Sequence, residues 1–242
     1  MRRKATWMVG GLLVLVGTLA LSACGISGLG AAPKPTPTPD ARTILANAGK
    51  VEYNDLEFKM TIASSATGAS AVSGDGSGVI TKSPKRAKIT FNLTSSGQQI
   101  AFDTIEDFDG NAVYIKFSTA LIPGIPTDKW IKASAGGMLS SLTSAFDTSQ
   151  ITDFSRVSNA TLKGAETVDG NQVWHLTGTE SSSGSSATVD LYIRQDNNYP
   201  YKLVAHTAGT NATDVTVTFT GINTGATVDL PPADQVVAEP TP

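Results

Sequence analysis

The sequence contains little cysteine, histidine or charge. Of its 242 residues, one is cysteine, two are histidine, and 16% are charged. A single cysteine excludes an intramolecular disulfide and a cysteine-based metal site in the folded body. The formal net charge of −3 argues against nucleic acid, which needs a basic footprint. The sequence also lacks a P-loop, a dinucleotide fingerprint and a Gly-x-Ser-x-Gly elbow, so we expect no enzyme, no cofactor and no nucleic-acid partner.

The first residues have the pattern of an export signal. Residues 2–4 are basic, and residues 5–20 are mostly apolar and uncharged. Because this run is short and interrupted by glycine, it predicts a signal peptide better than a spanning helix. Leu21–Gly25 resembles the bacterial lipobox, which predicts cleavage after residue 23 and diacylglycerol on Cys24. The alternative is an ordinary signal peptide with cysteine at that position by chance.

Composition divides the rest of the chain. We expect a signal peptide over 1–23, a lipidated cysteine with a Pro-rich tether over 24–39, a folded domain over 40–237 and a disordered tail over 238–242. Proline at alternate positions of the tether favours extended polyproline II and blocks both helix and sheet. The expected location is therefore the extracytoplasmic face of the cell membrane, with the chain anchored by lipid.

Alternation of apolar and polar residues dominates the body. A short helix is expected first, capped by Asp40 and ended by Gly49. Period-two segments follow, and two Asp-Gly pairs between them predict hairpins. Residues 136–147 break this pattern with a helical spacing of apolar residues. The predicted fold class is α+β, a strongly curved antiparallel β-sheet (half-barrel) with a few helices over its concave face.

This order of elements, together with the lipobox, resembles the LppX/LprAFG family of exported lipoproteins and, more distantly, the LolA/LolB lipoprotein carriers. Five segments prompt the resemblance: Asp128–Lys132, Val189–Asp196, Tyr199–Leu203, Asp214–Phe219 and Val228–Pro232. The second and third look like the family's hairpin of strand, turn, proline and basic-aliphatic strand. The last two look like its closing strand and Pro-rich exit.

The resemblance implies a half-barrel whose apolar concavity holds acyl chains. It implies a membrane-anchored lipoprotein that binds a lipid or glycolipid for transfer or presentation outside the cytoplasmic membrane, with other envelope proteins as partners. Each methylene buried in such a cavity stabilises the complex by about 0.8 kcal/mol. The alternative function is a surface lipoprotein whose β domain is a protein-interaction or structural module.

The candidate ligand-binding residues are apolar side chains expected on the inner face or on the central helix. They are Leu56, Phe58, Met60, Ile62, Ile89, Phe91, Phe102, Val113, Ile115, Met138, Leu139, Leu142, Phe146, Val189 and Leu191. The strand residues line a cavity or form plain core, and the helix residues form a mobile lid or a fixed packing helix. We expect His175 and His206 to be structural and hydrogen-bonded. A solvated turn is expected around Glu106, Asp107 and Asp109.

Overall fold

The computed structural model describes residues 38–64, 71–119, 125–134, 137, 139, 148, 151–182, 185–208 and 212–240. The described residues from Pro39 onward belong to one unit, Pro39–Pro242. Within the described ranges, no helix has both the length and the apolar character needed to cross a membrane.

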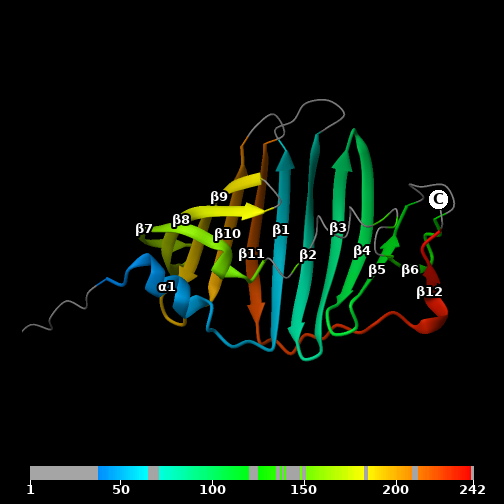
Figure 1. Cartoon of the computed structure of the whole chain (residues 1–242), viewed down its shortest axis with the longest axis horizontal. Coiled ribbons are helices and arrows are strands. Elements are labelled where there is room, and N and C mark those ends of the chain that lie inside the picture. Colours follow the sequence, from blue (N-terminus) through cyan, green and yellow to red (C-terminus); the bar gives the residue numbers. More distant parts are fainter. Residues whose placement is uncertain are drawn as a thin grey trace, which may run out of the picture. The chain divides into compact units, whose positions relative to one another are not determined.

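The fold is a single large sheet with one short α-helix among the described residues (Figure 1). The helices are α1 (Ala41–Ala48) and the 3-10 helices η3 (Phe154–Arg156) and η4 (Ala233–Gln235). The strands are β1 (Asp55–Ser64), β2 (Val72–Lys82), β3 (Lys85–Ser95), β4 (Gln98–Asp107), β5 (Ala112–Phe117), β6 (Trp130–Lys132), β7 (Val157–Val168), β8 (Asn171–Ser182), β9 (Ser185–Arg194), β10 (Pro200–Thr207), β11 (Thr213–Ile222) and β12 (Val236–Ala238).

The strand order is β12-β6-β5-β4-β3-β2-β1-β11-β10-β9-β8-β7. The last strand of the second half, β11, therefore pairs with the first strand of the chain, β1, and joins two meanders. The sheet is curved and does not close, which agrees with the half-barrel expected from the sequence (Figure 1). All pairs are antiparallel except β12 with β6, which is parallel.

The helix predicted at the start of the body is confirmed. The carboxylate of Asp40 accepts a hydrogen bond of 2.7 Å from the backbone amide of Thr43, as expected of an N-cap. Gly49 ends the helix, and Ile44 is buried on its inner side. The expectation of several helices over the concave face is not confirmed, because α1 lies near β7 and η3, at one end of the sheet, and most of 136–147 lies outside the described residues.

Side chains alternate between two faces of the sheet. On β1, Leu56, Phe58 and Met60 are buried, whereas Lys59 and Thr61, at alternate positions, are exposed. The same alternation on β3, β5 and β11 follows from the period of two residues in a strand. One face is therefore apolar and the other carries the polar residues, as the sequence pattern predicts.

The C-terminal segment departs from the expected disordered tail. Its residues Val236–Ala238 form β12 on the edge of β6. The carboxylate of Glu239 accepts hydrogen bonds of 2.7 Å from the amides of Ser134 and Leu139. Backbone pairing and a charged acceptor thus hold the chain as far as Glu239, beyond the Ala238 at which the sequence places the start of disorder.

Candidate functional site

The apolar face of β1–β5 and β11 is the largest apolar feature of the described chain. Its buried residues form one cluster: Leu56, Phe58, Met60, Ile80, Ala87, Ile89, Phe91, Leu93, Phe102, Ile115, Phe117, Ile125, Ile131, Leu139, Val217 and Phe219. The register of the strands brings these side chains together, because Phe91 lies opposite Phe102, and Phe102 lies opposite Phe117 on the next strand. The rings of Phe91 and Phe102 stack with centroids 4.9 Å apart.

A row of glycines runs through the middle of this face. Gly74, Gly76 and Gly78 occupy its positions on β2, opposite large side chains of β1 and β3. A Cβ atom added at Gly78 would lie 2.7 Å from Cζ of Phe58 and 2.6 Å from the carbonyl oxygen of Lys88. Side chains of the neighbouring strands, such as Phe58, therefore occupy the space above β2 that the side chain of any residue other than glycine would need.

The structure brings together most of the predicted site residues. Seven strand residues lie in the cluster: Leu56, Phe58, Met60, Ile89, Phe91, Phe102 and Ile115. Leu139 also belongs to it, and Ile62 and Val113 pack against it while partly buried. Met138, Leu142 and Phe146 lie outside the described residues.

The remaining two predicted residues lie on strand β9, beyond β11 and β10. Val189 is fully buried, and Leu191 belongs to a second cluster beneath α1. In that cluster Ile44 and Ala48 of the helix pack on Leu191, Ile193 and other residues of the sheet. Protein side chains thus fill this end of the apolar face.

The sequence missed a buried carboxylate on the same face. Glu106 lies opposite Ala87 of β3 and Val113 of β5, and its Oε2 accepts a hydrogen bond of 2.5 Å from Oγ1 of Thr148. Both residues are buried. The expectation of a solvated turn is therefore wrong for Glu106, and also for buried Asp107, whose Oδ1 lies 3.3 Å from Nε of Arg86. The charge of Glu106 suggested exposure, but its position in the period of two residues on β4 turns it toward the apolar face.

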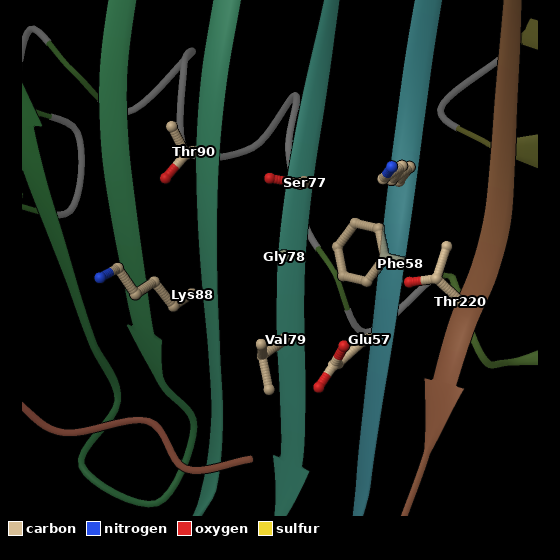
Figure 2. Close-up of a pocket in the computed structure, with 9 residues that line it drawn as sticks. Glu57, Phe58, Ser77, Gly78, Val79, Lys88, Thr90 and Thr220 are labelled. Carbon is tan, nitrogen blue, oxygen red and sulfur yellow. The ribbon is translucent and has the colours of Figure 1, made fainter. Parts of the chain in front are cut away.

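The polar face bears a hollow of about 360 Å³ over β3, β2, β1 and β11 (Figure 2). Charged and hydroxyl side chains line most of it: Glu57, Lys59, Ser77, Lys88, Thr90 and Thr220. Phe58, Gly78 and Val79 line the rest. With charges of both signs at its wall, this hollow does not suit an acyl chain.

No group of three or more metal-ligand side chains of the kind that holds an ion occurs among the described residues. Several carboxylates of the polar face instead accept hydrogen bonds. Thr90 Oγ1, for example, donates to Asp103 Oδ1 over 2.6 Å.

These features define a class of protein: an open, strongly curved antiparallel sheet with one apolar face. No protein-family model matches the chain. No curated protein matches it either. Among solved structures, it is similar to LprF from Mycobacterium bovis, with a TM-score of 0.52 and 15% identity over 79% of this chain and 96% of that one.

Two further solved structures show lower similarity. LppX, a lipoprotein from Mycobacterium tuberculosis, gives a TM-score of 0.49 with 17% identity over 78% of this chain and 99% of that one. A LolA superfamily protein from Nitrosomonas europaea gives 0.35 with 13% identity over 80% and 96%. The likeness to LprF shows that the chain has the LprF fold, and so confirms at the level of fold the resemblance expected from the sequence.

Proposed function

We propose that the chain is a lipid-anchored, non-enzymatic lipoprotein of the cell envelope that binds the acyl chains of a lipid or glycolipid. Binding takes place on the apolar face of β1–β5 and β11, and it serves transfer or presentation outside the cytoplasmic membrane. The observation that carries the proposal is that face itself. An unclosed sheet gathers aliphatic and aromatic side chains from these six strands and from β6 into one cluster.

The chemistry of this face suits an acyl chain. Its lining is hydrocarbon and phenyl ring, and each methylene that leaves water for such a surface contributes about 0.8 kcal/mol. The glycine row on β2 leaves the flanking side chains of β1 and β3 without a side chain between them. Glu106 and Thr104 are buried polar residues on the same face, on β4. They are positioned to orient the polar end of a lipid.

Native mass spectrometry of the purified chain, followed by organic extraction, tests the proposal. We expect stoichiometric lipid bound to the protein, and its loss in Met60→Trp or Ile115→Trp, because an indole fills space on the apolar face. Thr61→Trp is the matched control, since Thr61 is the next residue on β1 and is exposed on the opposite face. A lipid-free mass that stays unchanged after incubation with phospholipid vesicles would overturn the proposal and favour a protein-interaction module.

The anchor is tested separately. Cells that express the chain are fed an alkyne-labelled fatty acid, and the label on the protein is read by gel fluorescence. We expect label on the wild-type chain and none on Cys24→Ala, because Cys24 supplies the only thiol. Equal labelling of both would show that Cys24 is not the lipidated residue, whatever the lipid-binding result.

A further inference from the structure

Five side chains from five neighbouring strands form a line across the polar face of β7–β11. Carboxylates and imidazoles alternate along it: Glu166, His175, Asp190, His206 and Asp214. The successive N–O distances are 2.7, 2.9, 4.0 and 2.7 Å. The line contains both histidines of the chain, and every imidazole nitrogen in it lies within 4.0 Å of a carboxylate oxygen.

The rules of hydrogen bonding determine the protonation state of His175 in which both of its contacts in the line are hydrogen bonds. An ionised carboxylate only accepts, and a neutral imidazole has one nitrogen that donates and one that accepts. His175 has Glu166 on Nδ1 and Asp190 on Nε2, so it satisfies both only when both ring nitrogens carry hydrogen. With neutral imidazoles the line would hold three carboxylates and no cation.

The surroundings of the line add few cations. The ring of Tyr192 stacks on His175, with centroids 4.5 Å apart and planes inclined by 18°. Burial, and then the charges of Asp190 and Glu166, raise the pKa of Tyr192, so the field of these two carboxylates reaches its hydroxyl. Lys202 is the nearby cation on β10, with Nζ 5.8 Å from the centre of the Tyr192 ring. Among the described residues, it makes no ion pair within 4.0 Å with Glu166, Asp190 or Asp214.

We propose that Glu166, His175, Asp190, His206 and Asp214 form a proton-dependent clamp that ties β7–β11 together when both imidazoles are charged and loosens when they are neutral. Each adjacent strand pair of this half is spanned by one link of the line: β7–β8, β8–β9, β9–β10 and β10–β11. Imidazole is the side chain that exchanges a proton between about pH 5 and 8. The clamp lies on the opposite face from the apolar cluster and does not depend on the proposed lipid binding.

The test combines a structural and a thermal measurement on the purified full chain. Because there are only two histidines, ring ¹⁵N chemical shifts report each imidazole separately. At pH 5.5 we expect both ring nitrogens of His175 to be protonated, with slow exchange of the Nδ1 and Nε2 hydrogens. Between pH 5.5 and 8 the melting temperature should fall by about 2–4 °C for each link lost.

Glutamine variants and a control decide the outcome. His175→Gln and His206→Gln should each flatten the fall in melting temperature. His175→Gln should do so more, because both links of His175 are hydrogen bonds, of 2.7 and 2.9 Å, whereas one of the two links of His206 is 4.0 Å long. Glu180→Gln is the matched control, since it removes the 3.3 Å pair with Arg156 in the same half of the sheet but no imidazole. The proposal is overturned if His175 at pH 5.5 has one unprotonated ring nitrogen, or if both glutamine variants keep the wild-type dependence on pH. Even if a variant does not fold, the ¹⁵N measurement on the wild-type chain remains decisive.

Discussion

Gly78 shows at the scale of one residue that close packing on the apolar face requires a residue without a side chain. A methyl group there would meet the Lys88 carbonyl oxygen at 2.6 Å and the Phe58 ring at 2.7 Å. We expect Gly78→Ala to lower the free energy of unfolding by about 1–3 kcal/mol, the usual effect of overpacking. Urea denaturation measures this, and Ser77→Ala on the exposed face should stay within about 0.5 kcal/mol of wild type. Equal losses in the two variants would contradict a role for close packing at Gly78.

Asp55 is a buried carboxylate that holds the turn after β11 against the start of β1. Its oxygens accept hydrogen bonds from the amides of Thr224, at 2.8 Å, and Gly225, at 3.1 Å. Burial alone raises the pKa of Asp55, but the hydrogen bonds from Thr224, Gly225 and Ala226 outweigh burial and hold the pKa below its ordinary value.

The lowered pKa of Asp55 determines the direction in which its contribution to the free energy of unfolding changes with pH. A carboxyl whose pKa is lower in the folded chain contributes its full stabilisation above the unfolded value of about 3.9, and loses it as the pH falls through the folded value. We expect Asp55→Asn to be less stable than wild type at pH 6, and the difference to shrink at pH 3. Chemical denaturation at both pH values measures this. Asp75→Asn, which removes an exposed carboxyl, serves as the control; a constant deficit in Asp55→Asn would refute the assignment.

At the scale of elements, the segment after β11 acts as a strap along the polar face to the edge of the sheet (Figure 1). Val228 packs against Ile105 and Trp130, and its carbonyl oxygen accepts from Nη1 of Arg86 over 3.2 Å. The strap then covers β6 with β12. It thereby pairs an edge strand that would otherwise present free backbone groups.

A chain that ends at Pro232 tests the strap. It lacks β12 and Glu239, so we expect it to lose about 2–4 kcal/mol of unfolding free energy, because several hydrogen bonds of about 1 kcal/mol each disappear. Amide hydrogen exchange across Trp130–Lys132 should also accelerate. A chain that ends at Pro240 keeps β12 and Glu239, and should match wild type in both measurements. Unchanged exchange in the shorter chain would show that β6 does not need β12.

The elements also show what the sequence can and cannot predict. Alternation along β1, β3, β5, β9 and β11 is local, and it predicted both the strands and their buried faces. β12 could not be found this way, because three residues carry no period and their partner β6 lies about a hundred positions earlier in the chain. The glycine row is visible in the sequence, since Gly74, Gly76 and Gly78 repeat with a period of two residues. Its role in packing cannot be predicted without the register of β2 with β1 and β3.

At the scale of the whole sheet, the apolar face is divided between two clusters. Under α1, the second cluster is filled by the helix, with Ala41, Ile44 and Ala48 packed over β8 and β9. The larger cluster spans β1–β6 and β11, and none of its buried members comes from α1. Strand periodicity predicts the candidate residues on the strands, but it cannot separate these two regions because their periods are identical. The position of α1 distinguishes the two regions. Because Leu191 packs in the cluster beneath α1, it belongs to the structural core.

This division predicts opposite outcomes for two substitutions of one kind. Leu191→Trp should lower the free energy of unfolding by about 1–3 kcal/mol through overpacking against α1, and should leave the amount of bound lipid unchanged. Met60→Trp should reduce bound lipid at least tenfold if the indole costs the complex about 1.4 kcal/mol or more. Denaturation and extraction on the same preparations measure both quantities. Loss of lipid in Leu191→Trp at a temperature where the variant is fully folded would place the ligand beneath α1 and extend the binding face over β9.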